Sequence, residues 1–414
     1  MSPKIDPYSK TVEDFLKNVR KRYDDEADYF KADFEAAIEG VQPRPDGTSD
    51  DVWKDWADAN VDTLCDFFQE WYDWGLKQYF QDGLNYIEKF SWINYNNCAG
   101  MYFVTEGSGR EMLADFTHLQ GMQMDDPSSK SLVDKWKEDL GPKVMANYKE
   151  GDWSTFNKFF IRELAPGVRP IDGEDDPSVV VAPTDCVINM IVDELTESTR
   201  IPCKGVTMNV RQLLDGSEYA TYFTRGRPAN PGGGTAVSCI LMPDTYHWYH
   251  APVSGQVVEA RDDIGGDYYG MRDFPELLNK GNVGYGYDYS MFDYFRRGYV
   301  IIKTPYFDHK GNPDGDGYVA LVPVGLNSIG SVKFLDKFRD ITKESTPVEV
   351  QKGNQIGYFQ YGGSLNILLF EKGRFPALQL LMGQRIGVLE ESRRTERLFE
   401  NFRRTRPRRV PPTS

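Results

Sequence analysis

The residues best suited to chemistry in this chain are a serine that follows two glycines and a pair of histidines upstream of it. Ser364 follows Gly362 and Gly363, and glycine permits backbone angles that are closed to other residues. The Ser364 hydroxyl could therefore reach back to the carbonyl of Gly363 and turn that amide into an ester, so that the chain cuts itself. The same three residues also form ordinary turns, and the motif alone leaves that interpretation open.

The two histidines, His247 and His250, are candidates for the base that such a serine needs. The whole chain contains four histidines, and the imidazole titrates in the range required to take a hydroxyl proton. An H-x-x-H spacing also fits a metal site or simple packing. Asp185 follows Pro183 and Thr184 in a turn. It could orient the base as the third member of a triad, or it could serve the turn alone.

Six stretches, taken in order, resemble the phosphatidylserine decarboxylase family over roughly residues 153–372. From the N-terminal side they are FNKFFIREL with GVRP (156–170), the Pro-Thr-Asp turn (183–185), Lys-Gly leading into Leu-Leu (204–214), LMP with YHWYHAPVSG (241–255), VGL with IGSV (324–332), and Gly-Gly-Ser (362–364). Six motifs in the family's order make a chance match very unlikely. The chain is therefore identified by its motifs as a member of this family.

The resemblance implies a role for each of these side chains. Asp185, His250 and Ser364 match the triad that drives self-cleavage at the Gly-Gly-Ser motif, and cleavage falls between Gly363 and Ser364. His247 matches the histidine of the decarboxylation step. The ester would break by β-elimination into a β chain and an α chain, and hydrolysis would turn the first α-chain residue into a pyruvoyl group. This covalent cofactor, made from Ser364, would form a Schiff base with a substrate amine and accept electrons while carbon dioxide leaves.

Two residues depart from the family pattern. Cys186 stands where the family usually has Gly or Ser after the aspartate, and it keeps that position small. Leu365 stands where the family usually has Thr after the cleavage serine, and an apolar side chain cannot donate a hydrogen bond to the ester. Fungal tryptophan decarboxylases of this group also depart here, so cleavage stays the expectation. Leu365 is also the observation that favours a third hypothesis, an uncleaved relative that binds a ligand without catalysis.

The hydrophobic pattern predicts an α+β fold in three parts. Residues 1–150 predict a helical N-terminal extension, in which one helix face carries Leu64, Phe67, Phe68 and Trp71. Residues 151–385 predict the catalytic domain, mainly antiparallel and rich in β-structure, with β-branched runs at 179–181, 187–192, 299–302 and 319–322. Residues 386–414 predict a basic, flexible tail.

Composition bounds the partners and the compartment. A formal net charge of −15 disfavours nucleic acid and anionic bilayers, and only the arginine-rich tail at 386–414 suits peripheral contact with a membrane. The five cysteines show no C-x-x-C spacing, which predicts neither a disulfide framework nor a metal site. The N-terminus lacks the apolar core of a signal peptide. We therefore expect a soluble, cytoplasmic protein.

The segment ahead of the FNKFF motif bears on the substrate. Family members typically carry an apolar membrane-docking segment there, whereas this chain has the charged residues Lys135, Glu138 and Lys143. That organisation resembles the soluble fungal tryptophan-decarboxylase branch. We therefore expect the substrate to be a free aromatic α-amino acid such as tryptophan. Phosphatidylserine, which would give phosphatidylethanolamine, is the alternative. A tyrosine-rich stretch at 263–298 could line a substrate pocket or cap a sheet edge.

Overall fold

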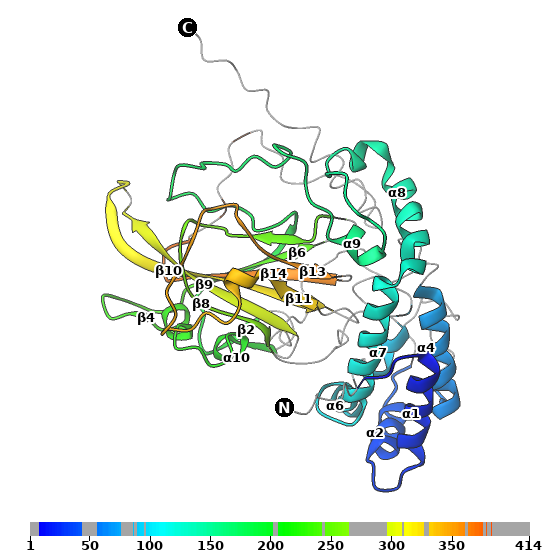
Figure 1. Ribbon diagram of the computed structural model, residues 1–414. Helices are drawn as coiled ribbons and strands as arrows, with labels where there is room; N and C mark the ends of the chain where they lie inside the picture. The colour runs from blue at the N-terminus through cyan, green and yellow to red at the C-terminus, as the bar shows by residue number, and fades with distance from the viewer. Residues whose placement is uncertain are drawn as a thin grey trace.

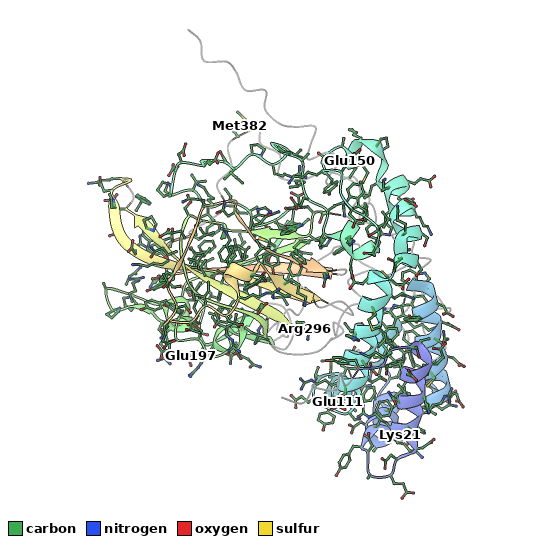
Figure 2. The ribbon with its side chains drawn as sticks, viewed as in Figure 1. Lys21, Glu111, Glu150, Glu197, Arg296 and Met382 are labelled. Carbon is green, nitrogen blue, oxygen red and sulfur yellow. The ribbon has the colours of Figure 1, made fainter. Side chains whose placement is uncertain are left out.

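The computed structural model describes residues 8–43, 56–75, 86, 89–94, 97–201, 206–241, 245–264, 296–308, 310–326, 331–360, 363–375, 378 and 382. Within them, helices of the N-terminal part stand beside a body of β-strands (Figure 1). Lys21 and Glu111 mark the helical part in Figure 2, and Glu197 marks the β-rich body. The predicted α+β class is confirmed. The predicted tail at 386–414, and all but the ends of the tyrosine-rich stretch at 263–298, lie outside the described residues.

An aromatic core holds the N-terminal helices together. The helices are α1 (Val12–Asp24), α2 (Phe30–Glu39), α4 (Val61–Gly75), α6 (Cys98–Thr105) and α7 (Gly109–Asp125), with the short turn η1 (Trp92–Asn94). After the turn η2 (Pro127–Ser129), helix α8 (Lys130–Met145) packs in a separate apolar cluster with Phe156, Phe159 and Phe160. The apolar face predicted for α4 is buried, as its spacing requires, at Leu64, Phe67, Phe68 and Trp71. The Phe68 ring centroid lies 4.6 Å from that of Phe116, so α4 packs directly against α7.

The β-rich body is built on a seven-stranded antiparallel sheet. In spatial order its strands are β1 (Val187–Val192), β6 (Thr235–Leu241), β14 (Gly363–Phe370), β10 (Pro313–Leu326), β9 (Arg297–Phe307), β8 (Gly255–Ile264) and β12 (Val348–Val350). Strand β14 pairs with β10 along its whole length and with β6 from Ser364 onward. The strand that begins with Gly363 and Ser364 is therefore held from both sides.

A smaller sheet carries His250, and His247 directly precedes its strand β7. It consists of β11 (Ser331–Phe334), β13 (Gln355–Gln360) and β7 (Trp248–His250). The remaining short elements are α9 (Phe156–Phe160), α10 (Val210–Leu213), α11 (Ala220–Thr224), η3 (Asp336–Phe338), and the hairpins β2–β3 (Ser198–Ile201, Val206–Asn209) and β4–β5 (Gly226–Arg227, Asn230–Pro231). Side chains fill the space among the strands in Figure 2.

Alternation along β14 divides the interior into two cores. Leu365, Ile367 and Leu369 pack with residues of α10 and α11, and we call this the helix-side core. Leu368 and Phe370 pack with residues of the small sheet such as Tyr249, Phe334 and Phe359, and we call this the sheet-side core. Side chains of a strand point alternately to opposite faces, so the cleavage motif begins a strand whose two faces are both covered.

One predicted strand is not formed. The valine run at 179–181 was expected to join a sheet because of its β-branched composition, but it is irregular backbone. Its polar groups bind loop partners instead, since the Val181 N–H donates to the Pro252 carbonyl and the Val179 carbonyl accepts from Lys352 Nζ. The predicted runs at 187–192, 299–302 and 319–322 all lie within strands.

The small sheet is packed so closely at Gly357 that a side chain does not fit there. A methyl group there would overlap the Lys333 carbonyl oxygen and lie 2.5 Å from Tyr249 Oη. Gly357→Ala should therefore lower the free energy of unfolding by about 1–3 kcal/mol, as measured by urea denaturation. Gly121→Ala in α7 is the control, because no heavy atom lies within 4 Å of the added carbon. An unchanged urea midpoint for Gly357→Ala would contradict this packing.

Candidate active site

His250, at the end of β7, has both ring nitrogens engaged. Nδ1 lies 2.7 Å from the carbonyl oxygen of Gly353, and Nε2 lies 2.9 Å from the hydroxyl of Tyr246. A carbonyl can only accept, so this network assigns the proton to Nδ1 and leaves Nε2 to accept from Tyr246. Burial lowers the pKa of His250 below its ordinary 6.5, and burial raises the pKa of Tyr246. The imidazole is therefore a neutral base whose lone pair faces a phenol.

Asp185 lies close to His250 but binds another residue. Its carboxylate forms a two-pronged ion pair with Arg169, with Nε–Oδ1 and Nη2–Oδ2 distances of 2.8 and 2.7 Å. The Asp185 charge still acts on His250 and favours the protonated imidazole, against the larger effect of burial. The Asp185 side chain is only 16% exposed, so its field is weakly screened. In this structure the aspartate influences the base through space, and the Gly353 carbonyl orients the ring.

Main-chain contacts tie the aspartate turn to the histidine strand. The His250 N–H donates to the Pro183 carbonyl at 2.8 Å, and the Thr184 hydroxyl donates to the Tyr246 carbonyl at 3.3 Å. These bonds bring two motifs more than sixty residues apart into one unit. Asp185 and His250 thus belong to one hydrogen-bonded unit, in which Arg169 binds the Asp185 carboxylate.

Ser364 stands at the start of β14, and its backbone position is set by its neighbours. It lies opposite Leu241 of β6 and Gly325 of β10 in the strand register. Leu241 belongs to the sheet-side core, which also contains Tyr249 and Ala251 on either side of His250. The triad of Asp185, His250 and Ser364 stays a prediction, and so does cleavage between Gly363 and Ser364.

His247 is fully buried beneath the FNKFF motif. Its ring stacks on Phe160 of α9, with centroids 4.0 Å apart and planes 27° apart. Its carbonyl accepts from the Phe359 N–H at 3.0 Å, which anchors the residue to β13. Phe160 thereby shields one face of the imidazole from water. The role of His247 in decarboxylation stays a prediction.

Arg162 explains why the FNKFF motif accompanies the histidines. This arginine is buried, and its guanidinium lies over the rings of Tyr148 and Phe159 at 4.3 and 4.7 Å. Its Nη2 donates to the Thr245 carbonyl at 3.2 Å, one residue before Tyr246. In addition, Trp248 Nε1 donates to the Ile161 carbonyl at 2.8 Å. The motif therefore acts as a support that fixes the chain around both histidines.

Sequence reasoning missed three participants: Tyr246, Arg169 and the Gly353 carbonyl. Tyr246 and Arg169 do stand inside quoted motifs, the YHWYH run and GVRP, so their types were available as signals. Gly353 offers no side chain, and a backbone carbonyl gives no signal of residue type.

The chain is similar to one known protein family and to several known relatives. The phosphatidylserine decarboxylase family model matches residues 156–391. Similar relatives are phosphatidylserine decarboxylase proenzyme 2 of Oryza sativa subsp. japonica (28% identical over 281 residues, 67% of this chain and 39% of that protein), and phosphatidylserine decarboxylase proenzymes of Anoxybacillus flavithermus (30% over 252 residues, 59% and 80%) and Fusobacterium nucleatum (29% over 267 residues, 64% and 75%). The match thus spans about two fifths of the rice protein and most of the bacterial ones.

The fold and the match define a pyruvoyl-dependent carboxy-lyase that is made as a proenzyme. The chain belongs to the phosphatidylserine decarboxylase family. The resemblance stated from its motifs is confirmed at this level, including the covalent pyruvoyl cofactor. Assignment to the tryptophan-decarboxylase branch receives no support from these relatives.

The Arg169–Asp185 pair makes a testable prediction for the pKa of His250. Asp185→Asn removes a charge that favours the imidazolium and leaves the Arg169 cation unbalanced, so the pKa of His250 should fall further. Arg169→Met removes the balancing cation, so the pKa should rise. Both are measured by NMR titration of the imidazole resonances. Arg374→Met, which breaks the separate pair with Asp314, is the control. Shifts of the same sign in the first two variants would contradict this electrostatic arrangement.

Proposed function

We propose that this chain cleaves itself between Gly363 and Ser364 and then removes carbon dioxide from the serine head group of phosphatidylserine, leaving phosphatidylethanolamine. The observation that carries the proposal is a neutral histidine base, His250, with an unprotonated Nε2, on a segment packed against the strand that begins with the Gly-Ser bond. The names of the relatives support the lipid substrate. The sequence analysis had favoured a free aromatic amino acid, and the relatives favour its alternative.

The first step requires a proton to leave the serine. Nε2 of His250 accepts the Ser364 hydroxyl proton while the oxygen attacks the Gly363 carbonyl. Tyr246 donates a hydrogen bond to the same Nε2. That hydrogen bond has to break before the Nε2 lone pair can accept the serine proton, so the Tyr246 hydroxyl controls access to the base. The Asp185 charge then stabilises the imidazolium that forms. Burial of His250 lowers its pKa, which favours the neutral imidazole before the reaction.

The described residues fit the pyruvoyl group that follows. The group itself withdraws electrons from the bond to the departing carboxylate. His247 can hold a proton for the carbon that loses the carboxylate, and Phe160 stacked on its ring keeps water from that face. Strand β14 keeps the position fixed through its pairing with β6 and β10.

A lipid substrate also requires contact between the protein and a membrane surface. Among the described residues, no helix combines the length and apolar character needed to cross a bilayer. The basic tail at 386–414, proposed to touch the membrane peripherally, lies outside those residues. A cytoplasmic location likewise stays part of the proposal.

Ser364→Ala tests the cleavage. The wild-type protein should separate into two chains that break between Gly363 and Ser364, the smaller blocked by a pyruvoyl group, and the variant should remain one intact chain. Intact-mass spectrometry distinguishes the two states. Ser238→Ala is the matched control, since it removes a buried serine hydroxyl from the adjoining strand β6 and should leave cleavage unchanged. An uncut wild-type chain after long incubation would favour the ligand-binding relative instead.

The substrate is tested by offering both candidates to the purified, cleaved enzyme. Vesicles that contain phosphatidylserine should release carbon dioxide and accumulate phosphatidylethanolamine, and free L-tryptophan should release none. Carbon dioxide is measured by isotope release and the lipid product by mass spectrometry, with uncut Ser364→Ala protein as the blank. Release from tryptophan alone would restore the free-amino-acid assignment.

A further inference from the structure

Asn366 is a polar side chain enclosed in an apolar interior. It is fully buried in β14, and neither Nδ2 nor Oδ1 has a hydrogen-bond partner within the part of the chain that the structure describes. An unsatisfied buried amide lowers the stability of the folded state, and an apolar side chain of similar shape would avoid that loss. The asparagine therefore makes no hydrogen bond that would explain it among the described residues, and its two polar atoms are available to a ligand.

The position of Asn366 connects it with the cleavage site. It lies opposite Cys239 of β6 and Pro323 of β10, and Cys239 belongs to the sheet-side core. Alternate residues of a strand share a face and are separated by about 7 Å. Position 364 is two residues earlier on the same strand, so the Asn366 carboxamide is within reach of a small molecule held at that position.

The intervening residue cannot take this role. Leu365 is fully buried in the helix-side core, opposite Ile240 and Val324. It therefore presents no polar atom and faces the other layer. Asn366 shares its face of β14 with Leu368 and Phe370 of the sheet-side core.

Two cysteines connect Asn366 with the aspartate turn. Cys239, directly across from it, shares a hydrogen bond with Cys186, and that bond together with burial keeps the Cys186 thiol protonated by raising its pKa. Cys186 directly follows Asp185. Asn366, Cys239 and Cys186 thus link β14 to the turn that carries the aspartate, without placing a formal charge in between.

We propose that Asn366 is a substrate-binding residue whose carboxamide binds the α-amino-acid group of the substrate held at position 364, and this inference rests on the proposed function. Nδ2 donates to the substrate carboxylate, and Oδ1 accepts from the substrate nitrogen. A neutral amide suits a carboxylate that must leave as uncharged carbon dioxide, because a lysine or arginine would stabilise the charged ground state more strongly. Serine head groups and free amino acids share this chemistry.

Asn366→Leu separates binding from structure, with Ser238→Ala as its matched control. Ser238 is also buried, and its hydroxyl has no hydrogen-bond partner among the residues that the structure describes. It lies opposite Ile367 and Met190, which belong to or border the helix-side core. Both variants should melt at the wild-type temperature or above, because each removes an unsatisfied polar group. Only Asn366→Leu should lose the rise in melting temperature caused by short-chain phosphatidylserine, with KM raised at least tenfold and a smaller change in kcat.

Asn366→Asp provides a second variant of the same size if the leucine disturbs folding. Its carboxylate repels that of the substrate, so it should also lose the ligand-induced rise. Parallel titrations with free L-serine and L-tryptophan show whether the recognised amino-acid group is lipid-borne or free. An unchanged KM and an unchanged ligand response in both variants would overturn the role of Asn366, and so would a lower melting temperature with normal binding.

Failure of the proposed function can be distinguished from failure of the role proposed for Asn366. An uncut wild-type chain by intact mass would reject self-cleavage. The melting response to short-chain phosphatidylserine would still be compared between the wild type and Asn366→Leu in that protein, and an equal response would reject Asn366 separately.

Discussion

The chemistry of this site depends on the hydrogen bond from His250 Nδ1 to the carbonyl of Gly353, because it decides which nitrogen of the imidazole is free to act. That carbonyl is held in place by its own neighbours. Lys352 is buried, and its ammonium donates to the backbone carbonyls of Gly173, Asp176 and Val179. Gly353 adopts a φ of 84°, in the left-handed region that glycine tolerates, and its N–H donates to the Ala251 carbonyl at 2.9 Å. The loop and strand β7 therefore fix each other, and the base inherits its orientation from both.

The electrostatic balance around this base follows from the same packing. Burial favours the neutral imidazole, while the Asp185 charge opposes it only in part, because the carboxylate is already bound by Arg169. An aspartate bonded directly to the ring would favour the imidazolium more strongly. The arrangement gives a base that is neutral before the reaction and an anion nearby once the imidazole becomes charged. The Asp185 carboxylate thus lies near His250 while the imidazole itself stays neutral before the reaction.

The buried polar side chains differ in whether their hydrogen-bonding groups have partners among the described residues. Arg162 and Lys352 are buried cations whose donors reach backbone carbonyls and whose neighbours are aromatic rings or loop backbone. Asn366, two residues after Ser364, has no hydrogen-bond partner among the described residues, although the interior of a strand is normally apolar or paired. Departures of this kind concentrate at functional sites, where stability is exchanged for chemistry. The apolar Leu365, by contrast, departs from the family pattern and simply completes a core.

Much of this protein could be predicted from the sequence alone. The order of motifs identified the family, and the helical spacing of residues 64–71 identified a buried face. The nearness of His247 and His250 in the chain predicted one site for both, and that stays a prediction. Residue type and local period carry these signals. Only the tertiary structure decided that Asp185 pairs with Arg169, that residues 179–181 bind loops rather than a sheet, and that Gly353 orients His250 from 103 positions away. Those outcomes depend on backbone carbonyls and on long-range packing, and neither leaves a mark on the amino-acid types along the chain.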